Sequence, residues 1–219
     1  MSGTRTGWAG RIHRWGWTLL LLALPLAGLA SPAPTRTSVL VVGDSLSAAH
    51  NIPAASGWVN LLDQRVQAQL QPAPAIVNAS VSGETTSGAL TRLPALLQKH
   101  RPKVVVIELG GNDALRGLSP AQLRSNLDRM VVLSADSGAR VLLLGIDVPP
   151  NYGPVYRQRL RQTYVEVARR HGAALVPFFL EGVALQPSLM QADGLHPTAA
   201  AQPRLLDNVW PVLRPLLKP

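Results

Sequence analysis

Four clusters of residues in this sequence carry groups that acyl transfer requires. Ser45 supplies a hydroxyl, and Asp193 and His196 lie three residues apart, so one short turn can bring their carboxylate and imidazole together. A serine hydroxyl is a weak nucleophile unless an imidazole removes its proton, and a carboxylate fixes the tautomer of that imidazole. The clusters around Gly83 and Asn112 add glycine backbone amides and an asparagine side-chain amide, which can donate hydrogen bonds to an oxyanion. Together these residue types indicate acyl-transfer chemistry at a serine.

The elements that must position these clusters are apolar runs that alternate with amphipathic stretches. Most of the apolar runs lack polar alternation, as expected for strands of a parallel sheet covered on both faces. The expected strands span residues 38–42, 75–78, 103–109, 140–146 and 174–176, and the expected helices span 58–70, 88–100, 120–133, 155–171 and about 199–217. Five such units predict an α/β fold, a flavodoxin-like three-layer α/β/α sandwich with a five-stranded parallel sheet. Ligands of such sheets bind beyond the carboxyl ends of the strands, so the residues that follow each apolar run are the candidates for a site.

Several helix ends have clear signals. Ser119 is a good N-cap and Pro120 suits the first helical position. Gly172 is placed to close the fourth helix. Pro211 removes a backbone donor from the last helix and is expected to bend or break it.

The N-terminal region has the layout of a cleavable signal peptide over residues 1–30. Three arginines precede an apolar run, and small residues at 28–30 supply a cleavage point. The alternative is a retained membrane anchor, but the apolar stretch 17–29 is shorter than the roughly 20 residues that a bilayer span needs. We expect a short extended lead-in over residues 31–37 and a single catalytic domain over residues 38–219, located in the periplasm or secreted.

Composition and net charge limit the classes of binding partner that we expect. The chain has 219 residues, 47% of them hydrophobic, with 21 Lys and Arg against 12 Asp and Glu, so it is globular and basic. A solvated positive surface explains the charge most simply, and peripheral attraction to anionic lipid head groups is the alternative. No basic stripe is interleaved with aromatic residues, so nucleic acid is not an expected partner. A monomer is the default expectation.

The sequence gives no sign of a cofactor. It holds no cysteine, which removes thiol nucleophiles and thiolate zinc sites, and it has neither an HExxH motif nor clustered carboxylates for a metal. Neither GxGxxG nor GxxxxGK[ST] follows any expected strand, which argues against a nucleotide site. Ser47 stands where a GxSxG motif would have glycine, so the nucleophile elbow of ordinary α/β-hydrolases is also not expected.

Motifs along nearly the whole catalytic domain resemble those of the GDSL or SGNH hydrolases, and within them the secreted multifunctional bacterial esterases of the acyl-CoA thioesterase I and arylesterase group. In family order, the matching stretches are VVGDSLSA, NASVSGETTSG, RLPALLQKHRP, ELGGNDALRG, VPPNYG, VPFFLEGVAL and DGLHPTAAAQP. The resemblance implies that Ser45 is the nucleophile, that His196 and Asp193 complete the triad, and that Gly83 and Asn112 join the Ser45 amide in the oxyanion hole. It also implies the flavodoxin-like fold that the strand pattern predicts independently.

The resemblance implies a small-molecule acyl ester or thioester as substrate, with short-to-medium acyl chains, aryl esters and lysophospholipids as the expected classes. Loops 111–119 and 147–153 are expected to line an acyl groove. The predicted substrate-binding residues are Asp44, Leu46, Asp113, Val148, Pro149 and Tyr152. Asp147 is an acid where a basic or apolar residue would fit the family pattern, so chain-length preference stays open.

Two residues near the predicted site have simpler interpretations. His50 is close to Ser45 in sequence but has no carboxylate at triad-like spacing, so we expect it at the rim or in a structural role. Glu108 lies within an apolar strand, where we expect a structurally satisfied carboxylate.

Two other functions fit the same sequence. An acyltransferase would use the same triad with a sugar or glycerol hydroxyl as acceptor, and a non-catalytic lipid carrier would bind ligand without a covalent intermediate.

Overall fold

The computed structural model describes residues 1–4, 6–7 and 39–218. The chain divides into two units, Met1–Pro34 and Thr35–Pro219, and the fold discussed below is that of the second. The predicted cleavage point at residues 28–30 and the lead-in at 31–37 lie outside the described residues. Within the described residues, no helix is long and apolar enough to cross a bilayer.

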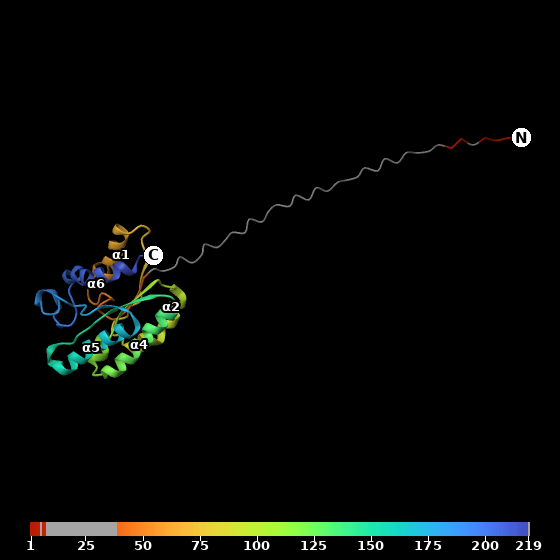
Figure 1. Cartoon of the computed structure of the whole chain (residues 1–219). Coiled ribbons are helices and arrows are strands. Elements are labelled where there is room, and N and C mark those ends of the chain that lie inside the picture. Colours follow the sequence, from red (N-terminus) through yellow and green to blue (C-terminus); the bar gives the residue numbers. More distant parts are fainter. Residues whose placement is uncertain (5, 8–38, 219) are drawn as a thin grey trace. The chain divides into compact units, whose positions relative to one another are not determined.

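The centre of the fold is a five-stranded parallel sheet in the order β2-β1-β3-β4-β5 (Figure 1). Two neighbouring interior strands, β1 and β3, are buried along their whole length, which explains their runs of valine, leucine and isoleucine. The strands are β1 (Val39–Gly43), β2 (Ile76–Asn78), β3 (Val104–Glu108), β4 (Arg140–Leu144) and β5 (Ala174–Val176). This confirms the predicted α/β three-layer class, and each strand lies within two residues of its predicted limits.

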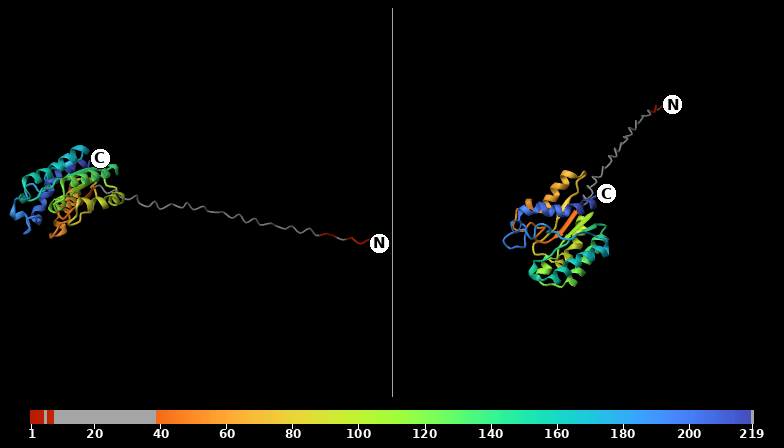
Figure 2. Two further views of the ribbon diagram at one scale, coloured as in Figure 1. Left: turned by 90° about the horizontal axis from the view of Figure 1, so that it is seen from below. Right: turned by 60° about the vertical axis from the view of Figure 1, so that its left-hand side comes forward.

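Helices cover both faces of the sheet (Figure 2). On one face α1 (Trp58–Gln69) packs beside α6 (Gln202–Leu216), and on the other α4 (Pro120–Asp136) lies between α2 (Thr86–His100) and α5 (Pro154–His171). A short helix that the sequence did not predict, α3 (Gly111–Leu115), follows β3 directly.

The helix ends follow the local sequence signals, with one exception. The Ser119 side chain accepts a hydrogen bond from the backbone N–H of Gln122, and Gly172 closes α5 in the left-handed conformation with φ 64°. Of the expected bend or break at Pro211, the break is absent, because α6 continues to Leu216; the bend stays a prediction. Because Pro211 has no N–H, the carbonyl of Asp207 lacks its helical hydrogen bond. Both residues lie on the exposed face of α6, where water can bind that carbonyl.

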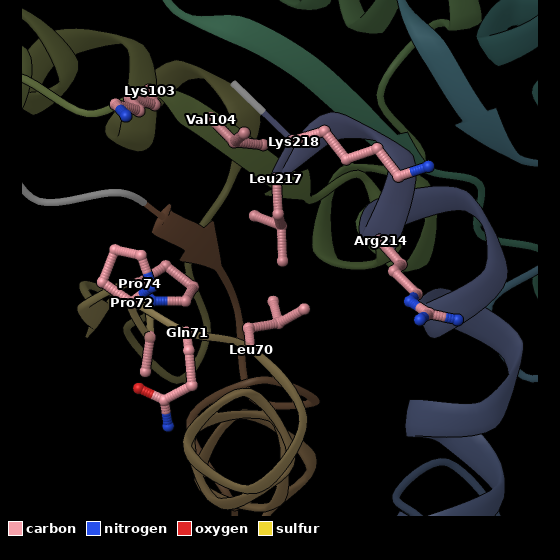
Figure 3. A pocket seen from close by; sticks show the side chains of 10 residues that line it. Leu70, Gln71, Pro72, Pro74, Lys103, Val104, Arg214, Leu217 and Lys218 are labelled. Carbon is pink, nitrogen blue, oxygen red and sulfur yellow. The ribbon is translucent and has the colours of Figure 1, made fainter.

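A hollow of about 280 Å³ opens at the amino ends of the strands, where β3 begins with Val104 (Figure 3). Leu70 and Leu217 point toward each other across it, and Pro72 and Pro74 form one wall. Lys103, Arg214 and Lys218 add basic side chains to its lining. The loops that carry Ser45 and Asn112 leave the opposite edge of the sheet, so this hollow is separate from the predicted site.

Candidate active site

The predicted site forms at the carboxyl edge of the sheet. β1 and β3 pair in parallel with Gly43 opposite Glu108, so the segments that leave these two strands begin side by side. The first segment carries Ser45 and the second carries Asn112. The segment after β5 brings His196 to the same edge, where it meets Ser45 across 151 positions of sequence.

A continuous series of hydrogen bonds joins the serine, the histidine and the aspartate. His196 Nε2 lies 2.9 Å from Ser45 Oγ, and His196 Nδ1 lies 2.6 Å from Asp193 Oδ2. The second carboxylate oxygen of Asp193 accepts the backbone N–H groups of Leu195 and His196 at 2.9 and 3.0 Å. These two bonds fold residues 193–196 into a tight turn, which is why the three-residue spacing brings the carboxylate to the ring.

The ionisation state of Asp193 is the one that a carboxylate needs to stabilise a protonated imidazole. Partial desolvation opposes its ionisation, but hydrogen bonds from the backbone and ring of His196 and from the Leu195 amide outweigh that effect and lower the pKa of Asp193 to about 2. Asp193 is therefore ionised at neutral pH. An ionised carboxylate at Nδ1 selects the tautomer in which Nε2 is free to accept the serine proton.

Asp44 holds Asn112 in place beside the serine. Asp44 Oδ2 accepts a hydrogen bond from Asn112 Nδ2 at 3.0 Å, and Asp44 Oδ1 accepts the backbone N–H of Leu46 at 3.0 Å. Burial raises the pKa of Asp44 to about 6, although the hydrogen bonds from Leu46 and Asn112 act in the opposite direction. Asp44 thus fixes both the turn around Ser45 and the orientation of the Asn112 amide.

The buried carboxyl group of Glu108 anchors the turn that carries Ser45. Ser47 Oγ donates to Glu108 Oε2 at 2.7 Å and accepts from Trp58 Nε1 at 3.1 Å, and the backbone N–H of Asp44 also points at Glu108 Oε2 at 3.4 Å. Burial and then the charge of Asp44 raise the pKa of Glu108 well above its usual value. The expectation of a fully satisfied carboxylate is therefore wrong: one oxygen is well bonded, while Oε1 has no partner among the described protein atoms.

Gly43 makes this close packing possible. A Cβ at this position would lie 2.8 Å from the Ser47 side chain and 2.9 Å from Glu108 Oε2, closer than real contacts allow. The glycine of the GDSL stretch is therefore needed for space and not for a positive φ.

A cavity of about 220 Å³ opens in front of the serine. Seven of the predicted site residues line it: Asp44, Ser45, Leu46, Asn112, Val148, Pro149 and His196. Ile146, Leu180 and Leu195 extend its apolar wall. A second cavity of about 230 Å³ adjoins it and shares the wall residues Asp147, Val148, Pro149, Leu180 and Leu195. The two cavities therefore lie side by side, with a largely apolar wall in common.

Four predicted residues do not line this cavity: Asp193, which lies behind His196, and Gly83, Asp113 and Tyr152. Gly83 has a φ of 79°, and its carbonyl accepts a hydrogen bond from Arg116 at 3.1 Å. Asp113 is buried, and its carboxylate accepts from both the backbone N–H and the hydroxyl of Thr86, so it ties α3 to the start of α2. The Tyr152 hydroxyl lies 3.4 Å from the carbonyl of Leu115. Substrate binding by Asp113 and Tyr152 stays a prediction.

Two residues at the site, Asp147 and His50, are not among the predicted catalytic or substrate-binding residues. Asp147 is nearly buried and is bound by Arg157 and Arg161, each at 2.6 Å, so α5 neutralises the acid that departs from the family pattern. The ring of His50 packs against the ring of His196. From its position five residues after Ser45, His50 was expected at the rim or in a structural role, but its contact with the ring of His196 was not predicted.

Sequence comparison gives the family. The model of the GDSL-like lipase/acylhydrolase family matches residues 41–203, a range that holds Ser45, Asn112, Asp193 and His196. The chain belongs to this family. Among the relatives of this family member is "Esterase TesA" of Pseudomonas aeruginosa, 54% identical over 199 residues that cover 91% of this chain and 98% of the relative. "Thioesterase 1/protease 1/lysophospholipase L1" of Escherichia coli is 39% identical over 206 residues, covering 94% and 95%.

Solved structures of similar proteins agree with the fold. The crystal structure of TesA is 55% identical, covers 82% of this chain and 99% of its own, and superposes with a TM-score of 0.79. The psychrotrophic esterase EstA from Pseudoalteromonas, whose structure title describes inhibition by monoethylphosphonate, is 39% identical, covers 83% and 99%, and has a TM-score of 0.78. These similarities confirm the family resemblance and the three-layer α/β fold that the sequence predicts.

Among the described residues, no group of three or more His, Cys, Asp or Glu side chains is arranged to hold a metal ion.

Proposed function

We propose that this GDSL-family hydrolase is a serine esterase and thioesterase that acts through an acyl-serine intermediate. The observation that carries the proposal is the hydrogen-bonded series from Asp193 through His196 to Ser45, with a cavity open in front of the hydroxyl. The names of its relatives, which include an esterase, an arylesterase and a thioesterase and lysophospholipase, support the same class of reaction.

In the first half of the reaction, Ser45 Oγ attacks the carbonyl carbon of the ester or thioester while His196 Nε2 takes its proton. The ionised Asp193 stabilises the imidazolium that forms. The developing oxyanion accepts hydrogen bonds from the Asn112 side chain and from the backbone amides of Ser45 and Gly83. His196 then protonates the leaving alcohol or thiol, and an acyl-serine remains.

In the second half, a water molecule occupies the place of the leaving group. His196 takes a proton from this water, which attacks the acyl carbon, and the same donors stabilise the second oxyanion. Return of the proton to Ser45 Oγ releases the carboxylic acid. Since one imidazole serves both halves, replacing His196 removes both acylation and deacylation.

The cavity walls support short-to-medium acyl chains and aryl groups as substrates. Val148, Pro149, Leu180 and Leu195 line both cavities, so an acyl chain bound at Ser45 has apolar side chains to pack against. The carboxylate of Asp147 is paired with two arginines, so the wall does not present an unpaired negative charge to the acyl chain.

The test is hydrolysis of nitrophenyl esters and acyl thioesters of increasing chain length by the wild type and by Ser45→Ala. Ser80→Ala is a matched control, because the Ser80 hydroxyl is buried without a partner among the described residues. We expect Ser45→Ala to lose several orders of magnitude of activity and Ser80→Ala to keep it. Full activity of Ser45→Ala would contradict the proposal.

The acyltransferase and carrier alternatives make different predictions in the same assays. An acyltransferase would give ester products in place of free acid when glycerol or a sugar is added, so the ratio of transfer to hydrolysis separates the two. A carrier would bind ligand in one-to-one proportion without turnover.

We also propose that the protein is exported and acts as a monomer, with any contact to anionic lipid made by the basic lining of the hollow at the amino ends of the strands. Lys103, Arg214 and Lys218 provide that charge around an apolar floor. Sedimentation with anionic and neutral vesicles tests the contact, since Lys103→Glu and Arg214→Glu should weaken binding to the anionic vesicles only. Equal binding to both kinds of vesicle would contradict it.

A further inference from the structure

His50 lies against the imidazole that the proposed mechanism depends on. The ring centroids of His50 and His196 are 4.4 Å apart and the ring planes are inclined by 39°, a packed aromatic pair. Both nitrogens of the His196 ring already take part in hydrogen bonds, Nε2 with Ser45 and Nδ1 with Asp193. His50 does not line the cavity in front of Ser45. It therefore contacts the ring of His196 without being part of the wall of that cavity.

Hydrogen bonds fix the position of His50 relative to both partners. The backbone N–H of His50 donates to the carbonyl of Ser45 at 3.2 Å, so the serine and His50 belong to one closed turn. The side-chain amide of Gln191 donates to the carbonyl of His50 at 2.9 Å and to that of Pro197 at 3.0 Å. Gln191 thereby joins the loop that carries His50 to the loop that carries His196.

The backbone around His50 is held in an unfavourable conformation. Ala49 and Asn51 on either side have φ angles of 56° and 55°, in the left-handed region that residues other than glycine adopt at an energetic cost. Ala49 also packs closely on Gly57, where an added Cβ would lie 2.9 Å from the Ala49 Cβ. Strain of this kind persists only where the surrounding structure fixes it, and it is concentrated at functional sites.

We propose that His50 is a positioning residue for His196. Its ring supports one face of the imidazole and restricts rotation of that ring, which keeps Nε2 directed at Ser45 Oγ through both halves of the reaction. The inference rests on the proposed function, because it assigns His50 a role through His196. An aromatic ring of similar width is what this role requires, and the nitrogens of His50 take no part in it.

The experiment compares His50→Ala and His50→Phe with the wild type in steady-state hydrolysis of a nitrophenyl ester. Small displacements of a reacting group can cost up to about a hundredfold in rate, so we expect His50→Ala to lower kcat about tenfold to a hundredfold with KM nearly unchanged. His50→Phe keeps the ring and should retain most of kcat. His100→Ala, at the end of α2, is the control for loss of a histidine outside the site and should behave as wild type. Melting temperatures of all four proteins accompany the kinetics.

Three results would overturn the proposal. One is wild-type kcat in His50→Ala, another is an effect on KM instead of kcat, and the third is a His50→Phe variant that folds normally but is as slow as His50→Ala. If His50→Ala does not fold, the comparison of folded His50→Phe with the wild type still decides whether the ring is sufficient. Failure of the proposed function gives a different result, because the wild type itself would then hydrolyse no ester.

Discussion

The side-chain amide of Asn112 donates a 3.0 Å hydrogen bond to the carboxylate of Asp44, the residue directly before the proposed nucleophile. One N–H of the Asn112 amide is occupied by this bond, which leaves the other free to donate. The oxyanion donor is thus oriented by the turn that carries Ser45, so the serine and its proposed donor keep a fixed relation without help from the substrate.

Replacing Asn112 with alanine should lower kcat by about 10² to 10³ with little change in KM, because the donor acts on charge that develops only in the transition state. Steady-state kinetics with a nitrophenyl ester measures both constants. Asn60→Ala serves as the control, because it removes an amide of α1 that donates a 3.4 Å hydrogen bond to the carbonyl of Ala55, in the turn before that helix. A change in KM alone would show that Asn112 acts on the bound ground state instead.

The stability of the fold should decrease as the pH rises through about 6. Burial raises the pKa of Asp44 to about 6 from 3.8, so the folded protein holds this proton more tightly than the unfolded chain. The stabilisation from that proton is complete below pH 3.8 and is lost as Asp44 ionises in the fold. Urea unfolding at a series of pH values between 4 and 8 measures the change.

Asp44→Asn identifies the group responsible for this pH dependence. The variant has no carboxyl to titrate, so its unfolding free energy should vary less between pH 4 and 7 than that of the wild type. Asp136→Asn, at the exposed end of α4, should keep the wild-type pH dependence. Identical curves for Asp44→Asn and the wild type would assign the effect to another group.

Glu108 should be replaceable by glutamine but not by alanine. The high pKa of Glu108, caused first by burial, means that the neutral form fits the fold, and glutamine keeps that neutral shape and an acceptor for Ser47. Alanine leaves the Ser47 hydroxyl without its acceptor and opens a cavity, at a cost of about 2 to 4 kcal/mol. Unfolding at pH 8 should rank Glu108→Gln equal to or above the wild type and Glu108→Ala well below. A large loss in Glu108→Gln would show that the charged form is the native one.

Asp147→Ala should weaken binding of long acyl chains more than it affects the chemical step. Asp147 joins Arg157 and Arg161 of α5 to the loop that carries Val148 and Pro149, so its loss frees the shared wall of the two cavities. We expect KM to rise for octanoyl esters and to change little for acetyl esters, with kcat nearly constant.

Asp128→Ala is the matched control for this variant. Asp128 also binds two basic partners, Arg170 and His171, but joins α4 to α5 away from the cavities. Its loss should affect stability without a dependence on chain length. Equal kinetic effects in Asp128→Ala and Asp147→Ala would attribute the change to general loosening of the fold.

The sequence was most informative where local rules act. Unbroken apolar runs such as 104–107 predicted the interior strands because a parallel sheet buries both faces. Ser119 and Gly172 predicted helix ends because capping depends on a few adjacent residues. Pro211 does not break α6, and its position on the exposed face of that helix became clear only from the packing.

The parts of the site that the sequence could not predict depend on contacts between distant segments. Asp113 adjoins Asn112 in the chain, yet it points away from the cavity toward Thr86, 27 positions earlier. The pairing of Asp147 with α5 and the contact of His50 with His196 arise in the same way. The closeness of Ser45 and His196 was expected, because the family motifs supplied the missing information about which loops meet.

The central claim is that the hydroxyl of Ser45 is activated for covalent attack by His196. Treatment of the folded protein with a serine-reactive phosphonate, followed by peptide mass spectrometry, tests it most directly. The account predicts one adduct per chain, on Ser45, with labelling slowed by orders of magnitude in His196→Ala and absent in Ser45→Ala. An unmodified Ser45 in the folded wild type, or labelling of Ser45 at the same rate in His196→Ala, would contradict it.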